Sequence, residues 1–223
     1  MRFVIVPVKE LSKAKNRLSG VLSKSQRISL AKAMLKDVLT ELSKCLLADK
    51  ICILTSDPDV KQLALEFSFD IIHEDEQTSE STSVDIGSVK CMEMGASSVL
   101  RIPGDAPLLK AKDIDSLFVN EKPYPHVILV PSKDETGTNA ILRKPPDSIP
   151  SRFGEGSLIK HINEAHNANI PVHVIRNRRL GLDVDDSDDL KNLIKEISKL
   201  SYKYTYSELL KIGLIKENRS KIA

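Results

Sequence analysis

The sequence contains no tryptophan, and aromatic residues make up only 4% of its 223 positions. Flat side chains on which nucleic-acid bases stack are therefore scarce. Its 33 basic residues are balanced by 31 acidic ones, which leaves a net charge of +2. A general nucleic-acid binder would carry a larger positive excess, so neither feature favours a nucleic-acid partner.

Cysteine is rare as well. The three thiols, Cys45, Cys52 and Cys91, are scattered and form neither a CxxC pair nor a Cys/His zinc spacing. Reduced, buried thiols are the simplest interpretation. The N-terminal apolar run, from Phe3 to Val6, is too short for a signal peptide or a membrane span. We therefore expect a cytoplasmic protein without a membrane partner.

Apolar residues make up 41% of the chain, enough for a core, and short apolar runs alternate with helical patterns. Strands are expected at residues 2–8, 50–55, 70–73, 98–102, 127–131, 139–142, 172–176 and 180–184. Helices are expected at 25–44 (with a capping box of Ser23 and Gln26), 58–67, 83–95, 112–120, 157–168 and 187–200, and a loop at 74–82.

This alternation predicts an α/β fold, a three-layer sandwich with a mostly parallel central sheet. We expect one domain over residues 1–223, in which residues 202–223 form a C-terminal extension of unassigned role. Ligands bind such sheets beyond the carboxyl ends of the strands. The residues that follow the strands are therefore the first candidates for a functional site.

After the first strand, the segment PVKELSKAKNRLSG (residues 7–20) carries the cations Lys9, Lys13, Lys15 and Arg17. Closely spaced cations and exposed backbone amides suit a triphosphate. The segment lacks the GxxxxGK[ST] pattern of a Walker A loop. A solvated basic loop is the alternative.

Two acidic features follow later strands. Asp105 stands between two prolines where the strand at 98–102 ends, and could cap a turn or hold Mg²⁺. Asp183 lies in the expected strand at 180–184 and Asp185 directly follows it, so on an extended backbone they would share a face and could share one ion. The neighbouring Ser187, Asp188 and Asp189 have a simpler explanation, as the N-cap and acidic first turn of the helix that follows, favoured by the helix dipole.

Glycine-rich segments supply a third kind of candidate. TGTNA (136–140) and FGEGS (153–157) contain Thr138, Gly154 and Ser157, which together would suit a phosphorylated acid. Ordinary turns and helix caps are the alternative. His161 lies four residues after Ser157 on the same helix face, where a structural role is favoured.

Taken in order, these motifs resemble those of a known family. The motifs are PVK-x-L-x-x-A-K-x-RL at 7–18, GD-x-PLL at 104–109, GTNA at 137–140, FG-x-GS-x-x-x-H at 153–161 and GLD-x-D at 181–185. They resemble the 2-phospho-L-lactate guanylyltransferase family, which includes phosphoenolpyruvate guanylyltransferases. The resemblance implies a nucleotide-diphospho-sugar-transferase-like, Rossmann-like fold. It also implies transfer of GMP from GTP to a phosphorylated three-carbon acid, with release of pyrophosphate, in the synthesis of coenzyme F420.

The resemblance also implies roles for individual residues. GTP would be held by Pro7, Val8, Lys9, Lys13, Lys15 and Arg17, with Lys9, Lys15 and Arg17 catalytic. Mg²⁺ would be held by Asp105 together with Asp183 or Asp185. The acceptor acid would be held by Thr138, Gly154 and Ser157.

Alternatives stay open at this point. A related nucleotidyltransferase with another nucleotide or acceptor fits the same motifs, as does a non-catalytic nucleotide-binding regulatory domain. Where the family has a GLN-like segment, this chain reads SVDIG at 83–87, so the choice of base is open. The sequence does not determine the oligomeric state, and a homodimer is one option.

Overall fold

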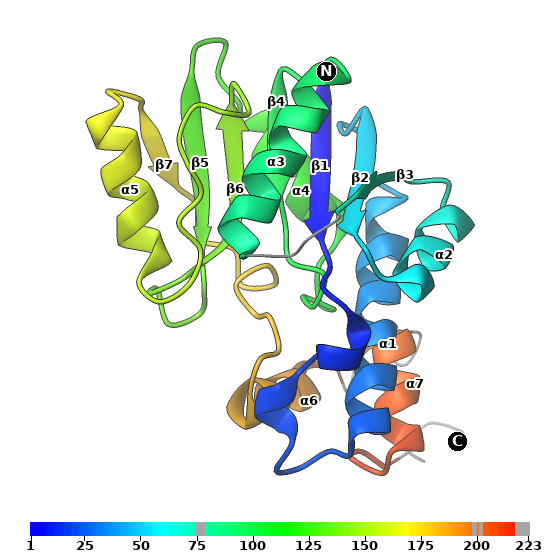
Figure 1. The fold of residues 1–223 in the computed structure, drawn as a ribbon. Helices are drawn as coiled ribbons and strands as arrows, with labels where there is room; N and C mark the ends of the chain where they lie inside the picture. The colour runs from blue at the N-terminus through cyan, green and yellow to red at the C-terminus, as the bar shows by residue number, and fades with distance from the viewer. Residues whose placement is uncertain (75–78, 198–199, 201–202, 217–223) are drawn as a thin grey trace, which may run out of the picture.

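A central sheet organises the protein. The computed structural model describes residues 1–74, 79–197, 200 and 203–216. Within these residues, seven strands lie in the order β3-β2-β1-β4-β6-β5-β7 (Figure 1). Their bounds are Arg2–Pro7 (β1), Lys50–Thr55 (β2), Asp70–His73 (β3), Ser98–Arg101 (β4), His126–Pro131 (β5), Thr138–Lys144 (β6) and Val172–Val174 (β7). Only β6 runs antiparallel to its neighbours, so the expected mostly parallel sheet is confirmed.

Helices connect the strands. They are α1 (Lys24–Leu42), α2 (Pro58–Glu66), α3 (Glu80–Glu93), α4 (Ala111–Val119), α5 (Ser157–Asn167), α6 (Ser187–Ile197) and α7 (Tyr204–Lys211), with short 3₁₀ turns at Leu11–Lys13 (η1) and Asn16–Leu18 (η2). The expected capping box opens α1: Ser23 N–H donates to Gln26 Oε1 at 2.9 Å, and Gln26 N–H donates to Ser23 Oγ at 3.3 Å. None of the described helices combines the length and apolar character needed to cross a bilayer.

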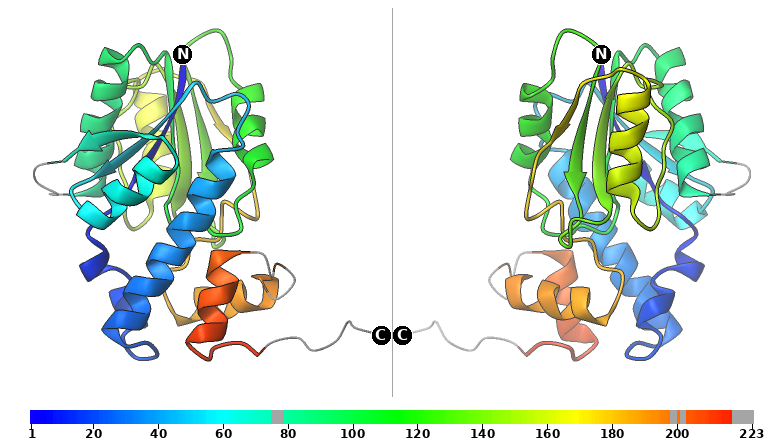
Figure 2. Two further views of the ribbon diagram at one scale, coloured as in Figure 1. Left: turned by 90° about the vertical axis from the view of Figure 1, so that its right-hand side faces the viewer. Right: turned by 90° about the vertical axis from the view of Figure 1, so that its left-hand side faces the viewer.

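The helices form a layer on each face of the sheet (Figure 2). On β1, Val4 and Val6 point into a core that they share with α1, α2 and α4. Phe3 and Ile5 alternate with them and point to the opposite face, which α3 covers. Because successive side chains of a strand point to opposite faces, one apolar run fills both cores. The expected three-layer sandwich follows from this arrangement.

A second core lies beyond the sheet edge, where α1 extends past the sheet and meets α6 and α7 (Figure 1). Of the described residues, it buries twelve apolar side chains: Leu18, Leu22, Leu30, Met34, Leu108, Leu182, Val184, Leu190, Leu193, Ile197, Tyr206 and Leu209. Helix α7, which the sequence pattern did not predict, is capped by Asp37 of α1. The two carboxylate oxygens accept the amides of Tyr204 at 3.0 Å and Thr205 at 2.9 Å. The cap comes from a distant part of the chain, so no local signal marked this helix.

The strand expected over residues 180–184 is wrong: the segment begins in a turn and has no regular secondary structure after it. Its backbone passes Asp105, whose carbonyl accepts the Val184 amide at 3.3 Å. The side chains of Leu182 and Val184 pack in the second core instead of in the sheet. The alternating pattern therefore indicates only that one side of the segment is apolar. Packing in the second core buries that side as well as a place in the sheet would.

The loop expected over residues 74–82 is also partly wrong, because α3 begins at Glu80. Residues 75–78 lie outside the described residues. Ser79 caps the helix, its Oγ accepting the Thr82 amide at 3.1 Å. The first turn shows no apolar period because its polar side chains bond to other segments. The other expected elements are present, with ends that differ by a few residues. Residues 198 and 199 of the helix expected over 187–200 lie outside the described residues.

We predict that Asp37→Asn loosens α7 from α1. The variant loses the charge that the helix N-terminus favours and one of the two acceptors, so the free energy of unfolding should fall by about 1–2 kcal/mol. Urea unfolding measures this loss, and hydrogen exchange should show faster amide exchange in α7 than in the sheet. The control is Asp147→Asn, whose carboxylate is exposed in the turn after β6 and not at a helix N-terminus; it should change stability by less than about 0.5 kcal/mol. Equal losses in both variants would contradict the capping role.

Candidate active site

A pocket of about 570 Å³ opens at the carboxyl ends of the parallel strands β1, β2, β3 and β4. Its wall includes Pro7, Val8, Lys9, Glu10, Leu11, Lys13, Ala14, Lys15, Ala31, Leu35, Ser56, Glu74, Glu80, Ser83, Arg101, Pro103, Gly104, Asp105 and Asp185. A larger pocket of about 1090 Å³ lies between α4, α6 and the segment after β7, and none of the candidate residues lines it. Position at the strand ends, and not size, therefore marks the first pocket as the candidate site.

Lys15 is the central charge of this pocket. Its ammonium contacts Asp105 and lies 3.0 Å from Asp185 Oδ1, and only 8% of its side chain is exposed. Burial disfavours the charged form, but the two carboxylates outweigh burial and raise the pKa of Lys15. Its backbone has φ 53°, a left-handed conformation that is strained for a residue with a Cβ. The turn between η1 and η2 thus holds a cation between two carboxylates.

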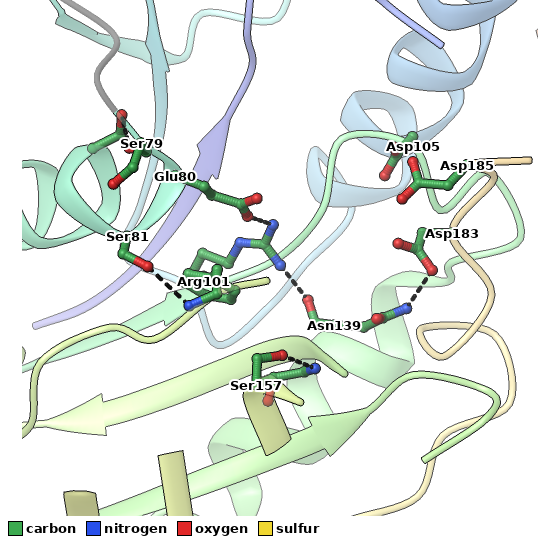
Figure 3. Close-up of polar contacts among 12 residues, drawn as sticks. Ser79, Glu80, Ser81, Arg101, Asp105, Asn139, Ser157, Asp183 and Asp185 are labelled. Atoms are coloured by element: carbon green, nitrogen blue, oxygen red, sulfur yellow. Dashed lines mark hydrogen bonds and ion pairs between the residues drawn. The ribbon is translucent and has the colours of Figure 1, made fainter. Parts of the chain in front are cut away.

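Asp183 is the third carboxylate of the cluster (Figure 3). Its Oδ1 accepts Asn139 Nδ2 at 2.9 Å. Burial, and the negative charges of Asp105 and Asp185, raise the pKa of Asp183 to about 6. Although the segment is not a strand, the structure therefore brings all three candidate aspartates to one place.

This cluster offers acceptor-only oxygens, the donor set that hard divalent cations prefer. As the side chains of the described residues stand, no three His, Cys, Asp or Glu groups are arranged to hold a metal ion. Lys15 instead supplies the positive charge between Asp105 and Asp185. The position thus accepts a cation, and a divalent ion would need these carboxylates to turn toward it.

The other candidate cations of the first segment differ in place. Lys9 and Lys13 line the pocket, and Lys13 forms an exposed ion pair with Glu10 at 2.9 Å. Arg17 is exposed and does not line the pocket. Pro7 and Val8 form part of the wall where β1 ends. The structure therefore gathers five of the six expected GTP-binding residues around one cavity.

The three candidate acceptor residues lie outside that wall. Ser157 Oγ accepts the Thr138 amide at 2.8 Å (Figure 3), and the Ser157 amide donates to the Gly154 carbonyl at 3.1 Å. The side chains of Thr138 and Ser157 are both buried. Gly154 has φ +113°, and a side chain there would meet open space. Thr138 and Ser157 thus already have partners within the chain, whereas Gly154 presents a bare backbone.

Sequence reasoning gave no role to Arg101, which connects the two regions. Its guanidinium pairs with Glu80, donates to the Asn139 carbonyl at 2.6 Å, and lies 4.4 Å from the centre of the Phe153 ring (Figure 3). It lines the pocket, and its buried Nε has no hydrogen-bond partner in the part of the chain that the structure describes. One signal could have found it: an arginine within the apolar run SVLRI must bring its own partners, because an unpaired buried charge is costly.

The chain matches the family model described as "Guanylyl transferase CofC like" over residues 1–221. The chain belongs to this family. It is 34% identical over 192 residues to a phosphoenolpyruvate guanylyltransferase of Conexibacter woesei, covering 86% of each chain. It is 32% identical to a 2-phospho-L-lactate guanylyltransferase of Methanobrevibacter smithii, covering 85% of this chain and 82% of the relative. A 3-phospho-D-glycerate guanylyltransferase of Colwellia psychrerythraea is 30% identical, with 85% and 90% covered.

Solved structures agree in fold with this member of the guanylyl transferase CofC-like family. A protein of Desulfovibrio desulfuricans described as a nucleotide-diphospho-sugar transferase superposes with a TM-score of 0.75 at 19% identity, over 94% of each chain. A cytidylyltransferase of Leptospira borgpetersenii gives a TM-score of 0.60 at 15% identity, over 100% of this chain and 99% of the other. The predicted fold and the predicted enzyme class, a nucleotidyltransferase, are confirmed.

His161 connects α5 to β6 and to the segment before α5 by hydrogen bonds. Its Nε2 accepts the Arg152 amide at 2.8 Å, and its Nδ1 lies 3.0 Å from Thr138 Oγ1. Because Nε2 accepts, the ring is neutral and carries its proton on Nδ1. Burial and the nearby charges of Arg143 and Arg101 lower the pKa of His161 to about 4. The favoured structural role of this histidine agrees with these contacts.

We predict that His161 makes the fold sensitive to acid. A histidine whose folded pKa lies below its unfolded value of about 6.5 favours folding above that pH, and this contribution falls as the pH drops from 6.5 toward 4. The loss is at most about 1.4 kcal/mol per pH unit. Urea unfolding of wild type and His161→Gln at about pH 7 and pH 5 should show a stability gap that narrows in acid. A gap of the same size at both pH values would contradict the shifted pKa.

Proposed function

We propose that the protein transfers GMP from GTP to a phosphorylated three-carbon acid, 2-phospho-L-lactate or phosphoenolpyruvate, with release of pyrophosphate, in the synthesis of coenzyme F420. The observation that carries the proposal is the cluster of Lys15 with Asp105, Asp183 and Asp185 at the strand ends of a nucleotidyltransferase fold. The names of the relatives, which act on phosphoenolpyruvate, 2-phospho-L-lactate or 3-phospho-D-glycerate, support this substrate class.

The triphosphate would lie against the segment that follows β1. Lys9, Lys13 and Lys15 line the pocket there and supply positive charge to its anionic oxygens. Pro7 and Val8 form the wall beside it. Arg17, which is exposed, contributes only if it folds over the bound nucleotide. In this proposal Lys15 exchanges part of its contact with the aspartates for contact with phosphate.

For the metal we propose Mg²⁺ held by Asp105, Asp183 and Asp185. Their oxygens are suitable ligands, and the ammonium of Lys15 already shows positive charge in contact with two of them. When bound, Mg²⁺ would neutralise phosphate charge and stabilise the departing pyrophosphate. Asn139 would hold Asp183 in place through its bond to Oδ1.

The chemistry needs no general base. A phosphate oxygen of the acceptor, already ionised at neutral pH, attacks the α-phosphorus of GTP. The bond from the α-phosphorus to its bridging oxygen breaks, and pyrophosphate leaves with that electron pair. The residues Lys9, Lys15 and Arg17 would act by holding two anions together and by balancing charge as it moves to the leaving group.

The acceptor would bind near Gly154, whose bare backbone allows close approach. Thr138 and Ser157 are its proposed partners on either side. Because their polar groups are bonded within the chain, the acceptor would have to replace or share those bonds. The homodimer and the cytoplasmic location stay predictions.

We predict that pyrophosphate appears when the protein is incubated with Mg²⁺, GTP and 2-phospho-L-lactate or phosphoenolpyruvate. The measurement is an enzyme-coupled pyrophosphate assay with 3-phospho-D-glycerate as a third acceptor, and CTP, ATP and UTP in place of GTP. Release with another nucleotide alone would favour the related transferase. GTP binding by calorimetry without turnover on any acceptor would favour the regulatory domain.

We predict that Asp105→Asn lowers kcat/KM about 100-fold or more while the protein stays folded. The variant removes a charged ligand for the metal and one of the two carboxylate partners of Lys15, but no core volume. Turnover and urea unfolding are measured together. Asp147→Asn is the matched control, because its carboxylate is exposed and lies outside the pocket. An Asp105 variant that kept full activity would exclude the proposed metal ligand.

A further inference from the structure

The nucleotide pocket has two chemically different ends. One end carries Lys9, Lys13 and Lys15 beside the aspartate cluster. The other end, where β2 and β3 finish, is lined by Ser56, Glu74 and Ser83, and by the first turn of α3. Because the sheet order is β3-β2-β1-β4, these ends lie along one edge, and its outermost strands, β3 and β4, are three strand spacings of about 4.8 Å apart.

Glu74 is the unusual group at the second end. It follows β3 directly, is 7% exposed, and lines the pocket. Among the described residues, its one hydrogen-bond partner is the hydroxyl of Ser83, which also lies 2.8 Å from the Ser79 carbonyl. A hydroxyl has a single hydrogen, so Glu74 receives at most a shared hydrogen bond.

No lysine, arginine or histidine among the described residues forms an ion pair with Glu74, whereas the nearby Glu80 is already paired with Arg101. A buried carboxylate without a cation is costly unless donors satisfy it. Glu74 therefore lines the pocket with acceptor capacity that the described part of the chain does not fill. A ligand with donors at this end would supply the missing bonds.

A nucleotide laid along the sheet edge provides those donors. With its triphosphate against Lys15 and its α-phosphorus near Asp105, the ribose and base extend toward β2 and β3. Guanine presents two neighbouring donors, N1–H and the 2-amino group, which match the two oxygens of a carboxylate. Adenine, cytosine and uracil each place an acceptor on the corresponding edge, and a carboxylate repels an acceptor.

We propose that Glu74 is the residue that selects guanine, accepting N1–H and the 2-amino group, with Ser83 orienting the carboxylate. The proposal rests on the proposed function in taking GTP as the nucleotide. It also bears on the SVDIG segment, where the base preference was open: Ser83 opens that segment and touches Glu74.

The test is Glu74→Gln with GTP and XTP. Xanthine keeps N1–H but carries a carbonyl where guanine has its 2-amino group. The glutamine amide can accept N1–H and donate to that carbonyl, so the preference should reverse. We expect kcat/KM for GTP to fall roughly 10- to 100-fold, as for the loss of charged hydrogen bonds, and kcat/KM for XTP to rise above its wild-type value. Calorimetric binding of GTP and XTP without acceptor should show the same reversal.

The matched control is Glu93→Gln, which removes the same charge from an exposed position at the end of α3 outside the pocket. It should leave kcat/KM for GTP and for XTP unchanged. Equal losses for GTP and XTP in the Glu74 variant, or unchanged GTP use, would overturn the proposal. If the wild-type protein shows no turnover with any acceptor, the proposed function is wrong, but nucleotide binding still tests Glu74. A Glu74→Gln variant that binds XTP more tightly than GTP supports the proposed role, and one that still binds GTP more tightly rejects it.

Discussion

Three carboxylates at one sheet edge repel one another, and the ammonium of Lys15 makes their proximity tolerable. Asp105 and Asp185 contact this ammonium directly, while Asp183 lies behind them with a raised pKa. The left-handed backbone at Lys15 and the turn at Asp105 both help to bring the ammonium into contact with the carboxylates. The same balance prepares the site for its proposed ligands, because a metal ion and a triphosphate together bring matching charges of both signs.

Two buried arginines connect the aspartate cluster and its neighbouring strands to α3. Arg101 links Glu80 on α3 to the Asn139 carbonyl, and Asn139 in turn holds Asp183. On the same face, the fully buried Arg143 binds Asp85 at 2.7 Å. Such charges are costly to bury singly but hold elements in one arrangement when they are paired. Helix α3, whose N-terminal residues Glu80 and Ser83 line the pocket, is thus attached to β4 and β6.

Most of the fold could be predicted from sequence because hydrophobic period and helix caps are local. The strands at 50–55 and 70–73 and the capping box at Ser23 needed no tertiary information. The errors arose where a distant contact decided the local structure. Residues 180–184 have a strand-like pattern but satisfy it in the second core, and α7 depends on a cap from Asp37, far away in the chain.

The candidate site divides in the same way. The motifs show which residues carry charge at the strand ends, and in what order, since Lys15, Asp105, Asp183 and Asp185 belong to them. Three features depend on tertiary contacts: Lys15 lies between two of these carboxylates, Arg17 lies outside the pocket, and Glu74 lines the pocket with one hydrogen-bond partner among the described residues. The ion pairs of a side chain, and how far it is buried, depend on which distant segments contact it. A local sequence pattern carries no information about those contacts.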